Sequence, residues 1–446
     1  MSDRLEEFME GLEARNPGED VFHQAVRTTY ADVIEEYGSD DRIREQQILE
    51  RMTEPDRVVM FRVVWQTDEG ELHTNRAYRV QFNNSIGPYK GGLRFVRGLD
   101  LATCKFLGFE QTFKNALTGL PMGGAKGGSD FDPKGRSDAE VMRFCQSMMV
   151  ELHKYIGEDV DVPAGDIGVG EREIAYLFGQ YKRLAGRFAG ILTGKGLSFG
   201  GSAVRSEATG YGVAYFTGLM LDQHDGGLED KVCAISGAGN VSIFCAEKLI
   251  AEGAKVIALS DSDGTIHDPD GLDELKLDWV KELKLERRGR IGEYAEEFDC
   301  EYLEGEKPWG LECDLAFPSA TENELDSDDA LKLIENGCQA VVEGANMPVT
   351  VDATEHLRSE GILVGPAKAA NAGGVAVSGL EQSQNAARVS WSREEVDRQL
   401  REIMKTIHSD CVEKGEGSDG KVDYVRGANL AGFERVAEAM LAHGAV

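Results

Sequence analysis

The chain has 446 residues, enough for more than one hydrophobic core, and 41% of them are apolar. It carries 79 acidic against 48 basic residues, a formal charge of −31. A field of that sign repels phosphate and argues against nucleic acid or an anionic membrane surface as a partner. The charge is also compatible with adaptation to a salt-rich cell interior, where counterions screen self-repulsion.

Segments that would direct the chain to a membrane or an oxidising compartment are not apparent. No apolar run reaches the roughly 18–20 residues of a membrane span, and the opening "MSDRLEEFMEGLE" is acidic, unlike a signal or transit peptide. The eight cysteines are scattered, with no C-x-x-C pair and no histidine at metal-ligand spacing. We therefore expect a cytoplasmic protein with buried thiols and no metal site.

Residues 1–55 have the pattern of helices. Apolar residues recur at three- and four-residue spacing from Phe22 to Tyr37, and Gly38 ends the run. The next segments, "RVVMFRVVWQ" and "ELHTNRAYRV", flank "TDEG" and predict two strands joined by a short turn.

Helical spacing returns over residues 101–117, and Ser137 with Glu140 forms a capping box that predicts a further helix near 138–156. Together these elements predict an N-terminal α/β domain of mixed character, which we assign to residues 1–200.

The pattern changes near residue 231. Short apolar runs ("KVCAIS", "KVIALS", "CDLAF", "QAVVE", "ILVG") alternate with helical stretches, which is typical of a doubly wound parallel sheet. We assign a Rossmann-type domain to residues 201–424. A last helix, within 425–446, is expected to pack back on the first domain.

A dinucleotide loop is predicted where "KVCAIS" runs into "GAGNVS". Gly237 and Gly239 would let a pyrophosphate approach the N-terminus of the following helix, and Ser242 replaces the third glycine with another small residue. Asp261 ends the next strand, 24 residues after Gly237, close to the position expected to meet the adenosine ribose. An acidic residue there repels a 2′-phosphate, so these residues by themselves favour NAD.

Three lysines in the first domain stand in glycine-rich or amphipathic settings. Lys90 lies in "GPYKGGLRF", Gln111 and Lys114 share one face of a helix in "FEQTFKNAL", and Lys126 lies in "PMGGAKGGSDFDP". Asp166 follows a strand in "DVPAGDIGVG". Each lysine alone could be a solvated side chain. Because clustered cations repel one another, the set predicts a site for a small dianion.

Several long segments resemble those of glutamate dehydrogenase: "PYKGGLRF", "LPMGGAKGG", "VPAGDIGVG", "RSEATGYG", "VEGANMP" and "NAGGVAVSGLEQSQN". The resemblance covers nearly the whole chain and is greatest to the small hexameric type, within the Glu/Leu/Phe/Val dehydrogenase superfamily. It implies reversible oxidative deamination of L-glutamate to 2-oxoglutarate and ammonium, with hydride transfer to and from an iminoglutarate intermediate.

The resemblance also implies residue roles. Lys126 would be the catalytic lysine and Asp166 its proton-transfer partner, with the Gly165 backbone facing the substrate nitrogen. Lys90 and Ser378 would hold the distal carboxylate.

The carboxylate next to the reacting carbon would be held by Gln111, Lys114 and Asn371. The cofactor would be contacted by Thr209, Gly237, Gly239, Asn240, Val241, Asp261 and Asn346. The "SDS" at residues 260–262 resembles NADP-using members, so we expect NADP, with NAD as the alternative.

This chemistry agrees with the residues. A lysine crowded by Lys90 and Lys114 and removed from water has its charged form disfavoured, and enzymes bring such pKa values to roughly 7–8. The glycines around Lys126 would leave room for substrate and nicotinamide.

Two alternatives stay open. One is an amino-acid dehydrogenase for apolar side chains. It would need an apolar pocket where Lys90 and Ser378 stand, so these two residues argue against it. The other is a non-catalytic nucleotide-sensing protein, which would not need Lys126 together with Asp166, so the presence of both argues against it.

Overall fold

A computed structural model describes residues 3–224, 226–418 and 420–445. The chain forms two compact α/β units, in agreement with the predicted fold class. The first contains the chain up to Ala203, Val375–Val396 and the chain from Asn429 on; the second contains Val204–Gly374 and Asp397–Ala428. The expected single stretch 201–424 is therefore interrupted, because Val375–Val396 belongs to the first unit. None of the described helices is both long and apolar enough to cross a membrane.

The first unit is built on a mixed five-stranded sheet with the order β1-β2-β4-β3-β5. The predicted hairpin is present, with β1 antiparallel to β2, and β3 pairs in parallel with both β4 and β5. Strand β4 lies between β2 and β3, so its residues are central in the sheet. The strands are β1 (Arg57–Gln66), β2 (Leu72–Asn83), β3 (Tyr89–Phe95), β4 (Gly124–Ser129) and β5 (Asp161–Gly165).

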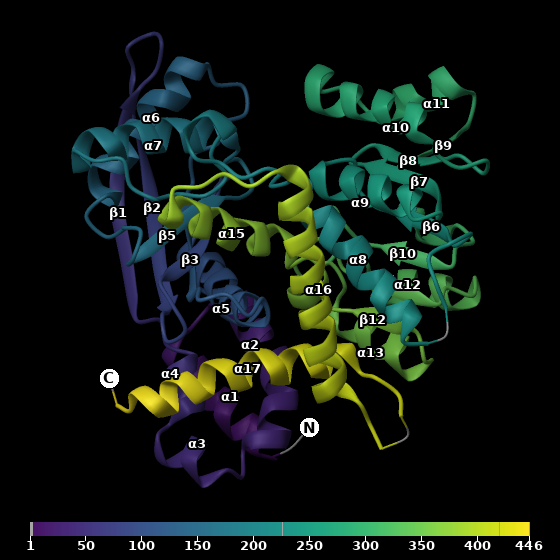
Figure 1. Ribbon diagram of the computed structural model, residues 1–446, viewed down its shortest axis with the longest axis horizontal. Coiled ribbons are helices and arrows are strands. Elements are labelled where there is room, and N and C mark those ends of the chain that lie inside the picture. Colours follow the sequence, from purple (N-terminus) through teal and green to yellow (C-terminus); the bar gives the residue numbers. More distant parts are fainter. Residues whose placement is uncertain (1–2, 225, 419, 446) are drawn as a thin grey trace. The chain divides into compact units, whose positions relative to one another are not determined.

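The helices of the first unit pack against this sheet or against one another (Figure 1). They are α1 (Asp3–Arg15), α2 (Asp20–Tyr37), α3 (Asp41–Glu45), α4 (Ile48–Met52), α5 (Leu101–Leu117), α6 (Asp138–Leu152), α7 (Glu171–Ala185) and the 3₁₀ turn η1 (Leu197–Phe199). The predicted capping box opens α6, with the Glu140 N–H donating to Ser137 Oγ at 3.1 Å. Leu93 and Phe95 of β3 pack into a core with α6 and α7. Arg94, between them in the strand, points the other way.

The second unit has a seven-stranded sheet with the order β12-β11-β10-β6-β7-β8-β9. The five predicted strands are parallel, whereas β8 and β9 extend the sheet antiparallel and were not predicted. The strands are β6 (Val232–Ile235), β7 (Lys255–Asp261), β8 (Gly264–His267), β9 (Glu301–Glu304), β10 (Leu315–Phe317), β11 (Ala340–Val342) and β12 (Leu363–Gly365).

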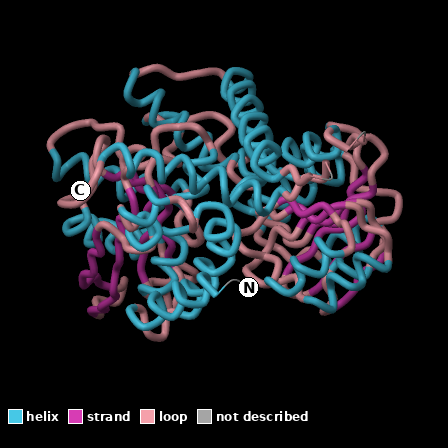
Figure 2. The backbone as a smooth tube through the Cα atoms, turned by 90° about the horizontal axis from the view of Figure 1, so that it is seen from below, coloured by secondary structure: helices cyan, strands magenta, loops and turns pink. Residues whose placement is uncertain are grey.

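Helices surround this sheet as well; Figure 2 shows the strands of each unit in magenta and the helices in cyan. They are α8 (Ala208–Asp222), α9 (Asn240–Ala251), α10 (Glu274–Lys281), the π-helical turn η2 (Glu282–Arg287), α11 (Gly292–Phe298), the 3₁₀ turn η3 (Pro308–Gly310), α12 (Ser327–Glu335), α13 (Val351–Ser359) and α14 (Ala367–Ala370). Three more helices each contain a boundary between the units: α15 (Gly373–Ala387), α16 (Arg393–Gly415) and α17 (Tyr424–His443). The carboxyl ends of the parallel strands form the edge at which such sheets bind ligands.

Candidate active site

Lys126 lies in the central strand β4 and is 4% exposed. Its Nζ is 3.1 Å from Asp166 Oδ2, just after β5, and Arg94 Nε of β3 donates to the same oxygen at 2.9 Å. One carboxylate therefore pairs with two cations in a largely buried site. The sequence predicted Lys126 and Asp166 together, and the structure adds Arg94.

Burial and these charges shift two pKa values. Burial lowers the pKa of the Lys126 amine and the Arg94 charge lowers it further, while Asp166 opposes them. Burial by itself raises the pKa of Asp166, but Lys126 and Arg94 outweigh it and hold that pKa well below its usual range. The lowered pKa of Lys126 was predicted, with Lys90 and Lys114 as the crowding cations; in the structure Arg94 is the cation with the largest effect.

The two shifts suggest different roles for the two groups. A carboxylate that holds its charge so firmly is a poor proton acceptor at neutral pH. Because Arg94 stays protonated, Asp166 keeps a partner when Lys126 loses its proton. The arrangement favours Lys126 as the group that exchanges protons and Asp166 as its countercharge, rather than the proton relay expected of Asp166.

The glycines around Lys126 serve the packing of the protein itself. A Cβ added at Gly123, Gly124, Gly127 or Gly128 would lie 1.9–2.4 Å from another atom of the chain. Those atoms belong to Asn83, Thr112, Tyr78 and Arg94, in that order. The prediction that these glycines leave room for ligands is wrong, because strands and helix α5 already fill the space.

A second cluster joins Lys90 and Ser378. The buried Lys90 Nζ donates to Thr193 Oγ1 at 2.7 Å, and that hydroxyl donates to Ser378 Oγ at 3.3 Å. Two residues predicted to share a carboxylate are thus connected through a third that was not predicted. An ammonium group and two hydroxyls in a buried site suit a carboxylate.

Gln111 and Lys114 both lie in α5 and are half-buried. The Gln111 amide donates to Asn115 Oδ1 at 2.7 Å, and Asn115 Nδ2 donates to the carbonyl of Lys90 at 3.1 Å. A Cβ at Gly91 would lie 3.3 Å from Gln111 Cγ. This turn of α5 therefore packs on the start of β3, beside Lys90.

In the second unit, the predicted glycine loop connects β6 to α9. Gly237 has a φ of +82°, in the region that favours glycine, and its N–H donates to Ser260 Oγ at 2.9 Å. Gly239 and Asn240 are exposed at the start of α9, where the first N–H groups of a helix lack helical partners. Ser242 Oγ donates to the carbonyl of Ser236 at 2.8 Å, which connects the first turn of α9 to the residue that follows β6.

The carboxylate oxygens of Asp261 already accept hydrogen bonds from other groups of the protein. Its Oδ2 accepts from Lys284 Nζ and from the Ile291 N–H, both at 2.9 Å, and its Oδ1 accepts from the Asp263 N–H at 3.1 Å. Burial by itself raises its pKa, but these hydrogen bonds and the Lys284 charge outweigh burial and lower it. Beside it, the exposed Arg290 donates to Ser262 Oγ at 2.8 Å.

Asn371 has a buried oxygen without a partner among the described residues. Its Nδ2 donates to the carbonyls of Gly344 at 3.1 Å and Ala345 at 2.9 Å, which uses both of its hydrogens. The predicted contact of Asn371 with a substrate carboxylate therefore has no donor in this structure. Its Oδ1 instead suits a donor such as an ammonium group or a carboxamide NH₂.

The other predicted cofactor residues also lie in the second unit. Thr209 is the second residue of α8, and a Cβ at Gly374 would lie 2.3 Å from its hydroxyl. Val241 is half-buried in the first turn of α9, and Asn346 follows β11, with its Oδ1 3.5 Å from Asn371 Nδ2. The positive-φ glycine, the open helix start and the orphan amide oxygen fit a nicotinamide dinucleotide.

Comparison with known sequences gives the family. Residues 200–444 match the profile of Glutamate/Leucine/Phenylalanine/Valine dehydrogenase, and residues 55–183 match the dimerisation domain of Glu/Leu/Phe/Val dehydrogenase. The chain belongs to the Glu/Leu/Phe/Val dehydrogenase family.

Three similar proteins of this family span nearly its full length. The NADP-specific glutamate dehydrogenase of Escherichia coli (strain K12) is 54% identical over 442 residues, 99% of each chain. The NAD(P)-specific glutamate dehydrogenase of Xylanibacter ruminicola is also 54% identical, over 98% of this chain and 99% of its own. The crystal structure of Plasmodium falciparum glutamate dehydrogenase has a TM-score of 0.96 at 48% identity, over 99% of this chain and 94% of that one.

Four residues of this Glu/Leu/Phe/Val dehydrogenase lie beside predicted site residues but were not singled out from the sequence. Arg94 was within reach, because it stands four residues after Lys90 in a strand and so on the same face. Thr193, Lys284 and Arg290 carry no local signal, since only tertiary contacts bring them to Lys90, Asp261 and Ser262.

Proposed function

We propose that the chain catalyses the reversible oxidative deamination of L-glutamate to 2-oxoglutarate and ammonium with NADP(H). The observation that carries this proposal is the buried cluster of Lys90, Thr193 and Ser378. An ammonium group and two hydroxyls meet where a dehydrogenase for apolar amino acids needs an apolar pocket. The five-carbon diacid has a second carboxylate to place there.

Lys126 is the acid and base of the proposed mechanism. A nicotinamide cofactor, when bound, would supply the acceptor for the hydride of the carbon that bears the neutral amino group, and the substrate would be left as an iminium. Neutral Lys126 Nζ takes a proton from the water that adds to that carbon. The resulting ammonium gives a proton to the departing amine, and the hydroxyl proton of the carbinolamine passes to the ammonia that leaves, so that the 2-oxo group and ammonium form and the lysine returns to its neutral form.

The groups around Lys126 support these steps. The ionised Asp166 stabilises positive charge, first on the iminium and then on Lys126 Nζ. The backbone of Gly165, next to Asp166 in the chain, meets the substrate nitrogen. Gln111 and Lys114, on one face of α5, hold the carboxylate next to the reacting carbon.

The cofactor is NADP rather than NAD. Asp261 normally indicates NAD, because a free carboxylate accepts the ribose hydroxyl and repels a 2′-phosphate. Here Lys284 neutralises it and backbone N–H groups occupy its oxygens. The neighbouring Ser262 hydroxyl and Arg290 guanidinium bind the carboxylate of Asp263, each at 3.2 Å, and are the donors that a 2′-phosphate would take up in its place.

The enzyme acts in the cytoplasm as a homo-oligomer, a hexamer. All eight cysteines are without disulfides, which supports a reducing compartment. Strand β1 is an edge of its sheet and exposes the apolar side chains of Val58, Met60 and Val64. Such an edge is a template for association with a second copy.

Initial rates at 340 nm test the function. Ammonium and 2-oxoglutarate should oxidise NADPH faster than NADH, and 2-oxo-4-methylpentanoate, the apolar control, should react poorly with either. A preference for the apolar oxo acid would refute the substrate assignment. Equal or faster rates with NADH would refute the cofactor assignment alone.

A further inference from the structure

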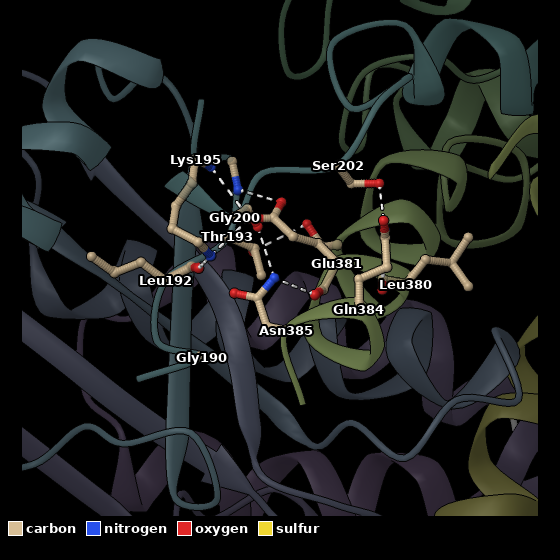
Figure 3. A network of polar contacts seen from close by, with 12 residues as sticks. Gly190, Leu192, Thr193, Lys195, Gly200, Ser202, Leu380, Glu381, Gln384 and Asn385 are labelled. Carbon is tan, nitrogen blue, oxygen red and sulfur yellow. Dashed lines mark hydrogen bonds and ion pairs between the residues drawn. The ribbon is translucent and has the colours of Figure 1, made fainter. Parts of the chain in front are cut away.

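A fully buried ion pair, Lys195 with Glu381, lies in the first unit. Both side chains are 0% exposed, and Lys195 Nζ is 2.8 Å from Glu381 Oε1 (Figure 3). Neither residue has a role in the chemistry proposed above. A charge pair removed this far from water calls for a physical reason.

A contribution to the stability of the fold does not explain this ion pair well. The desolvation of two charges costs about as much as their attraction returns, and apolar replacement of such pairs is often neutral or stabilising. What a fully buried ion pair does supply is a fixed geometry for the groups bonded to it.

Those groups are the backbone of residues 192–195. Glu381 Oε2 accepts from the Gly194 N–H at 2.9 Å, and Oε1 accepts from the Lys195 N–H at 3.4 Å. Lys195 Nζ also donates to the carbonyl of Leu192. The ion pair thus holds the chain on both sides of Thr193.

Thr193 is the residue that connects Lys90 to Ser378. Its N–H donates to the carbonyl of Pro163 at 3.0 Å, which places it beside β5. Ser378 and Glu381 are three residues apart on α15, and therefore on one face of that helix. One helix face thus contacts the Thr193 hydroxyl and anchors the backbone that carries it.

We propose that Lys195 and Glu381 are positioning residues that keep the Thr193 hydroxyl between Lys90 and Ser378, and thereby set the preference for a substrate with a distal carboxylate. This inference rests on the proposed function of that pocket. Loss of the pair should loosen the pocket without altering Lys126, Asp166 or the cofactor loop.

The experiment should remove the charges of Lys195 and Glu381 together. Lys195→Met alone leaves a buried, unpaired carboxylate, which is strongly destabilising. The double variant Lys195→Met/Glu381→Gln removes both charges and keeps an amide oxygen that can accept from the Gly194 N–H. Gln384→Met is the matched control, since Gln384 lies on the same helix and its side chain hydrogen-bonds Ser202 at 2.8 Å, Leu380 and Trp391 rather than residues 192–195.

The experiment compares L-glutamate with L-norvaline, which has the same five carbons and no distal carboxylate. In the double variant KM for glutamate should rise about 10- to 100-fold, as misplacement by about 1 Å can cause. Its kcat should stay within about threefold, and kcat/KM for norvaline should change little. The Gln384→Met control should keep the wild-type ratio of kcat/KM for the two substrates.

Binding without turnover gives a second readout. Glutarate, the five-carbon diacid without the amino group, should raise the melting temperature of the wild type and of the control but not of the double variant, while NADP protects all three.

An unchanged glutamate-to-norvaline ratio in a folded double variant would overturn the positioning role and leave the proposed function intact. A parallel fall for both substrates would show a merely structural pair and overturn the role as well. A wild type that does not prefer glutamate to norvaline refutes the proposed function, and the positioning role with it.

Discussion

Replacing Arg94 with methionine should move the pH dependence of catalysis, because Arg94 is the cation that most lowers the pKa of Lys126. Both Arg94 Nε and Lys126 Nζ bond Asp166 Oδ2, at 2.9 and 3.1 Å, so the two nitrogens are at most about 6 Å apart. At an effective dielectric of about 20, two unit charges at about 6 Å repel by about 3 kcal/mol. One pKa unit corresponds to about 1.4 kcal/mol, so the pKa of Lys126 should rise by about two units.

The direction in which the pH profile moves follows from which protonation state of Lys126 is active. Deamination requires the neutral amine, so the rate rises with pH through the pKa of Lys126. Without the Arg94 charge the amine keeps its proton to higher pH, and the acidic limb of the kcat profile for glutamate oxidation should move to higher pH by about two units.

The assay is kcat for glutamate oxidation from pH 5 to 10, with circular dichroism as the check on folding. Arg94→Lys keeps the positive charge and should leave the limb close to its wild-type position. A limb that stays within about half a unit in a folded Arg94→Met variant, against the two units expected from the charge, would refute the assignment of Lys126 as the titrating base.

Four further outcomes are expected. Lys126→Ala should lower kcat by about 10²–10⁴-fold, the range for loss of an acid–base group, with cofactor binding retained; a loss below tenfold would leave Lys126 without that role. The double variant Lys90→Leu/Ser378→Val should lose glutamate activity and gain activity with apolar amino acids, and continued preference for glutamate in rate assays would refute the pocket. Lys284→Met frees the charge of Asp261, so kcat/KM for NADPH should fall about tenfold or more relative to NADH; an unchanged ratio would contradict the neutralisation argument. The melting temperature should rise from low to molar KCl as the charge of −31 is screened, and a flat or falling trend would contradict a salt-adapted surface.

The sequence by itself determined much of this protein, wherever the signal lies within a short stretch of chain. The β1–β2 hairpin, helix α5 from Leu101 to Leu117, and the capping box at Ser137 follow from periodicity and local hydrogen bonding, and the structure has them. The parallel strands and the Gly237 loop were predictable for the same reason. The short antiparallel pair β8 and β9 was missed, because four-residue strands at a sheet edge have weak local patterns.

The tertiary structure decided the state of each charged group in the site. In sequence Asp261 looks like a carboxylate open to a ribose, but Lys284, 23 residues away, neutralises it. Thr193 lies 103 residues from Lys90 and 185 from Ser378, and only the fold makes them neighbours. Burial and the charges brought close by folding set a pKa and the strength of an ion pair, and the order of residues along the chain states neither.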